Sequence, residues 1–116
     1  MKYILLIYAN EAGLESASKK DVEQMHAAYG AYTEALQKAG VIAGGDRLRP
    51  TATATTVRVA NGKTNVLNGP YAETKEQLGG FYMIDVPDMD AALTWAARCP
   101  GASHGAIEVR PIWPMA

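Results

Sequence analysis

The chain has 116 residues, the size of one domain, and 48% of them are hydrophobic, which excludes an intrinsically disordered chain. Eleven Lys and Arg against twelve Asp and Glu give a formal charge of -1, which excludes a strongly basic surface for nucleic acid or anionic lipid. The lone Cys99 excludes an intrachain disulfide, and the apolar run near the start is too short for a membrane span, so we expect a cytoplasmic protein.

The first part of the chain predicts a strand, a helix and a second strand. Lys2–Ala9 (KYILLIYA) is a continuous β-rich run, typical of a strand that is covered on both faces. Ser18 and Asp21 resemble a capping box, and an apolar stripe of helical spacing continues from there to Gly40, which supplies the C-cap. Residues 41–48 (VIAGGDRL) predict the second strand, whose Gly-Gly pair indicates a bulge or a close backbone approach.

The second part predicts a hairpin and then another strand, helix and strand. Residues 51–60 (TATATTVRVA) alternate like a strand, and Asn61-Gly62 is the dipeptide of a type I′ turn, so the chain should return as a paired strand. Residues 80–86 (GFYMIDV) predict a further apolar strand, and Asp88 caps a short helix. Residues 106–112 alternate and predict the last strand.

This order of elements predicts one α+β domain over residues 1–116. It matches a ferredoxin-like split βαβ sandwich with an inserted β-hairpin, in which two helices lie on one side of an antiparallel sheet. Two helices cover only one sheet face, whereas Tyr3–Tyr8 and Phe81–Ile84 are apolar on both. We therefore expect a homodimer in which the uncovered sheet faces pack together.

His26 and Asp46 are the candidate catalytic residues. His26 lies at the border of the apolar helix stripe, and Asp46 follows the Gly-Gly pair, so the two form a general acid–base pair if the fold brings strand and helix together. The alternative is a half-exposed His26 that packs its ring on the sheet. Glu23 and His26 also have the spacing of a metal half-site, but with two His in the whole chain we expect no metal, and no flavin, nicotinamide or haem signature predicts a cofactor.

The loop of residues 68–80 (NGPYAETKEQLGG) has two interpretations. Its residues predict a turn at 68–70 and a helical turn at 72–76, so it is either a structural clamp or the border of a ligand cleft between helices and sheet. For a small organic ligand in such a cleft, the candidate lining residues come from this loop and from the tyrosines of the strands and the first helix: Tyr8, Tyr29, Tyr71, Glu73, Lys75 and Tyr82.

The segments MKYILLIYA, NGPYAETKEQLGGFYMIDV and IEVRPI resemble the YCII-related, DGPF-domain family over essentially the whole chain. The chain departs from the family pattern at Asn68, where Asp is usual, and at Tyr71, where Phe is usual. The resemblance implies a ferredoxin-like fold that dimerises sheet to sheet into an α/β barrel, and a His and Asp pair as catalytic residues. It also implies an association with sigma factors of the extracytoplasmic-function type, so the alternative to a ligand-binding dimer is a non-catalytic interaction module with a transcription partner.

Overall fold

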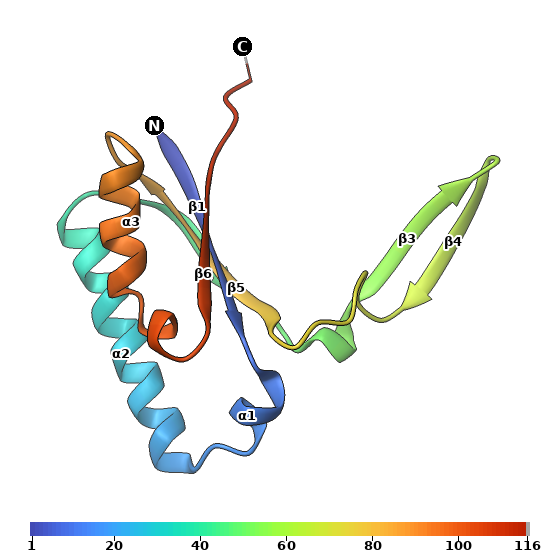
Figure 1. Ribbon diagram of the computed structural model, residues 1–116, viewed down its shortest axis with the longest axis horizontal. Helices are drawn as coiled ribbons and strands as arrows, with labels where there is room; N and C mark the ends of the chain where they lie inside the picture. The colour runs from blue at the N-terminus through green and yellow to red at the C-terminus, as the bar shows by residue number, and fades with distance from the viewer. Residues whose placement is uncertain (116) are drawn as a thin grey trace.

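The computed structural model describes residues 1–115, which fold into an α+β domain around a four-stranded sheet (Figure 1). The strands follow the order β2-β5-β1-β6, and every neighbouring pair is antiparallel. Their bounds are Lys2–Ala9 (β1), Ile42–Arg47 (β2), Gln77–Asp85 (β5) and Ala106–Pro111 (β6). The α+β class and the predicted sheet strands are confirmed.

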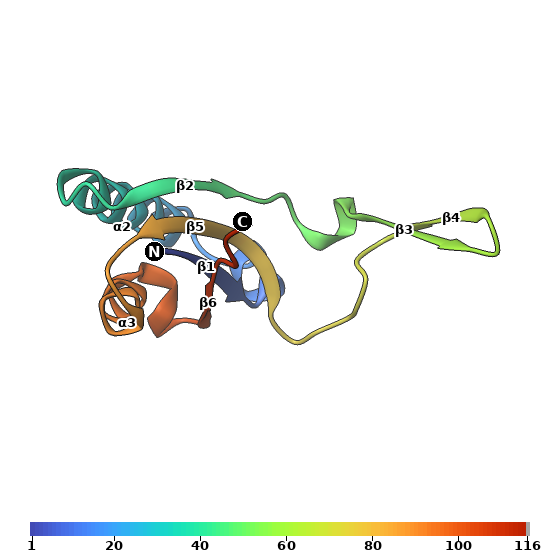
Figure 2. The same cartoon turned by 90° about the horizontal axis from the view of Figure 1, so that it is seen from above.

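Both long helices lie on the same face of this sheet (Figure 2). The helices are Glu11–Glu15 (α1), Lys19–Lys38 (α2) and Met89–Arg98 (α3), with short 3-10 turns at Thr51–Thr53 (η1) and Pro100–Ser103 (η2). Within residues 1–115, no helix combines the length and the apolar character that crossing a membrane requires.

Side chains at the helix ends explain where each helix begins. The Ser18 Oγ accepts a hydrogen bond from the Asp21 amide at 3.1 Å, as predicted for the start of α2. The Asp88 carboxylate accepts from the Ala91 amide at 2.9 Å and starts α3. The short helix α1 was not predicted; Asn10 begins it by accepting from the Gly13 amide at 2.9 Å.

The core lies between the sheet and helices α2 and α3. Its fully buried side chains are Leu5 of β1, Leu36 of α2 and Ile84 of β5. Alternation along β1 sends the odd-numbered residues, such as Leu5, into this layer and the even-numbered residues to the opposite face. The whole core consists of Tyr3, Leu5, Tyr32, Leu36, Ile84, Val86, Ala92, Ala96 and Cys99.

The opposite face of the sheet carries apolar side chains that no helix covers. Ile4 lies opposite Met83 and Leu6 lies opposite Phe81 across the β1–β5 pair, and all four side chains are half-buried by their neighbours on the sheet. We call this the uncovered face. It is the face for which the sequence predicts a second copy of the chain.

A bulge in β2 reverses the alternation of side chains along that strand. The register against β5 shifts between Ile42 and Gly44, as the Gly-Gly pair predicted. Gly45 therefore lies opposite Tyr82 on the helix side, and a Cβ there would lie 2.8 Å from the Phe81 carbonyl oxygen. Asp46 consequently faces the uncovered side, and Arg47 faces α2.

Strands β3 (Thr55–Ala60) and β4 (Lys63–Asn68) form a separate hairpin, which we call the arm. Its turn has φ of 52° at Asn61 and 75° at Gly62, which confirms the predicted turn with two positive φ values. The strand predicted over residues 51–60 begins only at Thr55. The amide and the hydroxyl of Thr53 both donate hydrogen bonds to the Pro50 carbonyl oxygen, and these bonds form the turn η1 before the strand.

The prediction of a helical turn at residues 72–76 is wrong, because the loop between β4 and β5 contains bends and no helical turn there.

An aromatic layer joins the two helices and the sheet. The Tyr32 hydroxyl donates to the Trp95 carbonyl oxygen at 2.7 Å, which connects α2 with α3. The Tyr32 ring lies edge-on to Tyr82 with 5.3 Å between ring centroids, and the Tyr82 hydroxyl shares a 2.7 Å hydrogen bond with Thr33 Oγ1. Because these contacts come from α2, α3 and β5, the layer fixes the position of both helices on the sheet.

Burial raises the pKa of Tyr29 and Tyr32 well above the ordinary value for a phenol, and the nearby Cys99 raises both further. In the unfolded chain these phenols ionise near pH 10, whereas in the folded chain they stay neutral. We therefore expect stability to be fully present below about pH 10 and to be lost progressively above it. A pH titration that follows phenolate absorbance and circular dichroism together should show that the last tyrosines ionise only as the fold is lost.

Two outcomes decide this prediction. The variant Tyr32→Phe should lose stability less steeply above that pH than the original chain does, although it also lacks the bond to Trp95. Complete ionisation of all six tyrosines with an unchanged circular dichroism spectrum would show that the phenols are not protected by the fold.

Candidate functional site

The candidate site is a groove along the half of α2 that extends beyond α3. With 20 residues α2 is about 30 Å long, whereas α3 with 10 residues is about 15 Å long. The C-terminal half of α2, with Tyr32 and Leu36, packs on the sheet and α3. Its N-terminal half lies beside α1 and η2 instead, and Ala27 and Ala28 of this half are exposed, as is Ala31 one turn farther along.

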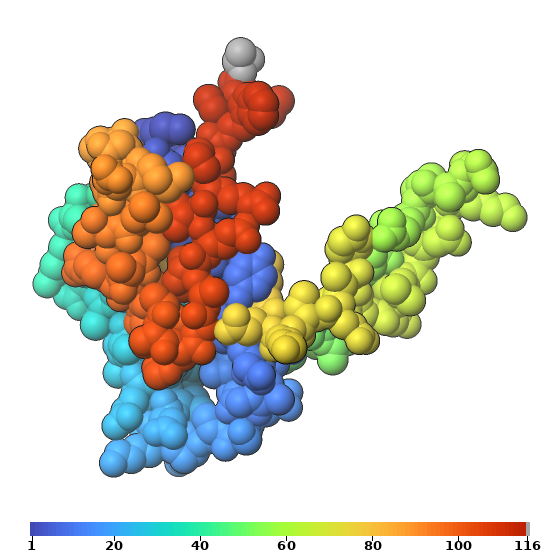
Figure 3. Space-filling view, viewed as in Figure 1, coloured from blue at the N-terminus to red at the C-terminus, as the bar shows by residue number. Residues whose placement is uncertain are grey.

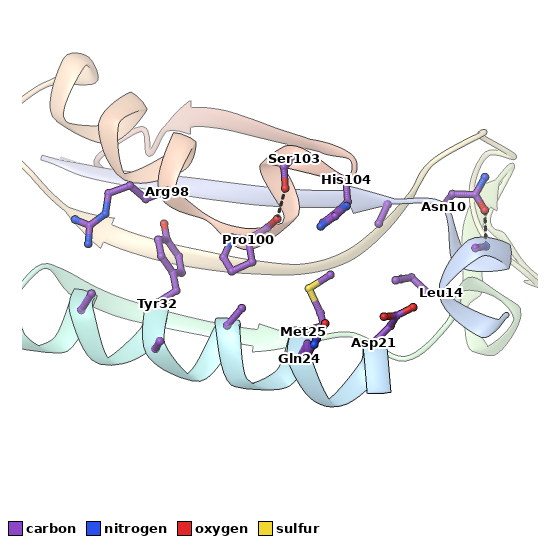
Figure 4. Close-up of a pocket in the computed structure, with 15 residues that line it drawn as sticks. Asn10, Leu14, Asp21, Gln24, Met25, Tyr32, Arg98, Pro100, Ser103 and His104 are labelled. Atoms are coloured by element: carbon purple, nitrogen blue, oxygen red, sulfur yellow. Dashed lines mark hydrogen bonds between the residues drawn. The ribbon is translucent and has the colours of Figure 1, made fainter. Parts of the chain in front are cut away.

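This groove has a volume of about 950 Å³ and is lined from five elements (Figure 4). Its walls are the end of β1, the start of α1, the inner side of α2, the end of α3 and the turn η2. The lining residues are Ala9, Asn10, Gly13, Leu14, Asp21, Gln24, Met25, Ala28, Ala31, Tyr32, Ala35, Arg98, Pro100, Ser103 and His104.

Charged and polar groups are spread along an apolar groove. Figure 4 shows Arg98 and Tyr32 toward one end, Met25 and His104 with Asp21 close by in the middle, and Leu14 and Asn10 toward the other end. The Arg98 guanidinium lies 4.3 Å from the centroid of the Trp95 ring, which orients the side chain through a cation–π contact. The groove can therefore accept an apolar body with a hydrogen-bond acceptor or an anionic group near Arg98.

The turn that carries His104 approaches α2 closely because it contains Gly101. A Cβ on Gly101 would lie 2.6 Å from the Tyr29 hydroxyl, which is closer than side-chain atoms pack. Pro100 starts the turn, and the amide of His104 donates back to the Gly101 carbonyl at 3.2 Å. Burial raises the pKa of the adjacent Cys99 thiol, whose Sγ lies 3.9 Å from the Tyr29 hydroxyl, so this sulfur belongs to the core and not to the groove.

His26 of helix α2 forms a hydrogen bond with Arg47 of β2, the edge strand of the sheet. The guanidinium Nη1 of Arg47 donates to His26 Nε2 at 3.2 Å on the exposed side of α2. The bulge in β2 brings Arg47 to this side and leaves Asp46, the predicted partner of His26, on the uncovered face. Neither His26 nor Asp46 lines the groove.

The six predicted ligand-binding residues lie in three separate places. Tyr29 and Tyr82 belong to the layer between α2 and the sheet. Tyr8 is half-buried on β1, on the uncovered face. Tyr71, Glu73 and Lys75 are exposed on the loop between the arm and β5; the Arg58 guanidinium lies 5.0 Å over the Tyr71 ring, and Glu73 lines a hollow of about 320 Å³ at the base of the arm.

Sequence reasoning missed the polar residues of the groove. From the sequence alone, Asp21 is interpreted as a capping residue, Arg98 as a charged residue at a helix end, and His104 as part of a surface loop. A signal was present in the run of alanines along α2, because Ala28, Ala31 and Ala35 leave space beside a helix where larger residues would fill it.

The structure assembles no recognisable metal centre in the part of the chain that it describes. Among residues 1–115, no three or more His, Cys, Asp or Glu side chains gather in a way that could hold a metal ion. Glu23 and His26 lie one turn apart on α2, and the recorded contact of the His26 ring is with Arg47.

Comparison with known proteins assigns the family. The family model described as the YCII-related domain matches residues 1–116. A protein of Rhizobium meliloti (strain 1021), which is named only as an uncharacterized protein, is 40% identical over 114 residues; the match covers 97% of this chain and 92% of the relative. The chain therefore belongs to the YCII-related family.

Proposed function

We propose that this chain forms a homodimer and that each copy binds a small organic ligand in the groove beside α2. The observation that carries the proposal is the groove itself. Its volume of about 950 Å³ lies in the range of small-molecule sites, and it combines apolar walls with a few polar groups that can orient a ligand.

The arrangement of charges favours an elongated ligand with one acidic end. Arg98 supplies a planar set of donors that suits a carboxylate, and His104 lies between Arg98 and the opposite end. Met25 and Leu14 offer apolar surface for the body of the ligand, while Asp21 would disfavour a second negative group. Monocarboxylates with an aromatic or aliphatic body fit this pattern best.

The homodimer follows from the uncovered face. Ile4, Leu6, Phe81 and Met83 form an apolar surface on two adjacent strands, and packing the same surface of a second copy against it removes both from water. The strand order and the two helical crossovers on one side support the ferredoxin-like description. Two such sheets packed face to face would make the α/β barrel that the family resemblance implies.

Acid–base catalysis by His26 and Asp46 stays a prediction. Within one chain the two residues face opposite sides of the sheet, because the bulge exchanges the directions of Asp46 and Arg47. Ligand binding in the groove does not depend on this pair, so it is the function that we propose.

The groove can be tested with small carboxylates as probes. We expect benzoate and its longer aromatic and aliphatic relatives to shift the NMR signals of the Met25 methyl group and of the Ala28 amide. The variant Ala28→Trp fills the groove and should weaken binding at least about tenfold, since the probe can no longer reach its apolar walls.

The matched control is Ala27→Trp. Ala27 is the preceding residue on α2, is also exposed, and does not line the groove, so this variant should bind like the original chain. Equal binding by both tryptophan variants, or signal changes that cluster away from the groove, would contradict the proposed site.

The dimer can be tested separately by sedimentation. We expect the protein to sediment with twice the mass of its 12.4 kDa chain. The variant Leu6→Glu places a charge in the centre of the uncovered face, twice in a symmetric dimer, and should raise the dimer dissociation constant by about 100-fold or more.

Leu93→Glu makes the same chemical change on the exposed side of α3 and should leave the dimer intact. Circular dichroism of both variants checks that they fold. A monomeric original protein at high micromolar concentration, or a Leu6→Glu variant that dimerises normally, would reject the sheet-to-sheet dimer.

A further inference from the structure

The arm has an apolar face that the rest of the chain leaves exposed. Val57 lies directly opposite Val66, and Val59 lies opposite Thr64, so the three valines share one face of the hairpin. We call this the valine face. Its valines are 58%, 68% and 63% exposed at positions 57, 59 and 66, and the arm stands clear of the body in the space-filling view (Figure 3).

The two faces of the arm differ in character. Arg58, Lys63 and Asn65 lie on the face opposite the valines, together with the exposed Leu67, so both charged residues of the arm lie on that face. Polar and apolar side chains alternate along β3 from Thr56 to Val59. Such alternation is typical of a strand with one dry and one wet face. A two-stranded hairpin is also marginally stable by itself, because it buries little apolar surface. The arm therefore has the sequence of a ribbon that packs on a partner.

The surface area of the chain indicates how much is left to cover. A monomer of this mass exposes about 6,100 Å² on average, whereas this chain exposes 8267 Å², an excess of about 2,100 Å². The radius of gyration is 16.2 Å, against about 13 Å for a compact chain of 116 residues. An excess of this size matches what one subunit of a permanent dimer contributes to its interface, so a second copy can cover it.

We propose that the valine face of the arm docks on a second copy of the same chain and so extends the sheet-to-sheet interface of the proposed homodimer, on which this inference rests. The arm leaves the sheet on the side away from the helices, which is the side where the uncovered face lies (Figure 2). A copy packed on that face is therefore adjacent to the arm. The valine face carries Thr and Asn besides its valines and no charged residue, as suits a neutral apolar partner surface.

Two variants and a matched control test this docking. Val57→Lys and Val59→Lys put a charge on the valine face, whereas Asn65→Lys puts the same charge on the opposite face of the same arm. We expect each valine variant to raise the dimer dissociation constant by about tenfold or more and Asn65→Lys to leave it unchanged, because only the first two charges would be buried against the partner. Sedimentation over a range of concentrations measures the constants.

Hydrogen exchange on the unmodified protein provides a measurement that needs no variant. Amides of β3 and β4 that pair within the arm should exchange slowly at concentrations where the dimer forms and faster where it dissociates. A dimer whose arm amides exchange equally fast at all concentrations, or whose three lysine variants dissociate alike, would overturn the docking of the arm and leave the sheet-to-sheet dimer standing. A protein that remains monomeric would overturn both, while the proposed ligand groove lies within one chain and is tested independently.

Discussion

Helices α2 and α3 lie on one face of a sheet whose central strands, β1 and β5, carry large apolar side chains on both faces. This one-sided cover determines most of the structure. Leu5, Leu36 and Ile84 reach complete burial because they lie on the covered side, whereas Leu6 and Phe81, on the same two strands, stay half-exposed. Burial of apolar surface is the main favourable contribution to the free energy of folding. The apolar side chains on the uncovered face would therefore add to stability only when another molecule covers them.

The unequal lengths of the two helices explain where the groove lies. Tyr32 marks the point at which α2 passes from a packed to an unpacked environment, because its hydroxyl reaches the Trp95 carbonyl near the end of α3. Beyond that point α2 extends past α3, and its alanines line the groove opposite α1 and the turn η2. The groove is thus the space that a longer α3 would fill.

The sequence predicts local structure well where a few neighbouring residues determine it. The cap at Ser18, the cap at Asp88 and the Asn61-Gly62 turn depend on contacts within a few residues, and all three are confirmed. The strands are predicted from local composition and are present, although the one expected from residue 51 begins at Thr55. The pairing of His26 with Asp46 required the fold to bring the strand and the helix together with Asp46 facing α2, and a single inserted residue at the bulge sends Arg47 to His26 instead.

The groove could not be predicted because its polar residues are separated along the chain. Asp21, Arg98 and His104 come from three elements, and each satisfies an ordinary local interpretation. Only the packing of η2 beside α2, which Gly101 permits, brings them along one cavity. Residues that looked promising on the loop, such as Tyr71, lie at the base of the arm, because the hairpin extends away from the helices.

Glu11 joins the base of the arm to the wall of the groove. Its carboxylate accepts hydrogen bonds from the amide and the hydroxyl of Thr51, both at 2.8 Å, and its own amide donates to Gln77 Oε1 at 3.0 Å. Thr51 begins η1, which leads into the arm, while Gly13 and Leu14 of the same short helix α1 line the groove. Hydrogen bonds to a carboxylate are stronger than those between neutral groups. The hydrogen bonds of Glu11 therefore connect the base of the arm with α1, the helix that forms one wall of the groove. A shift of Thr51 at the base of the arm would be transmitted to this wall through Glu11.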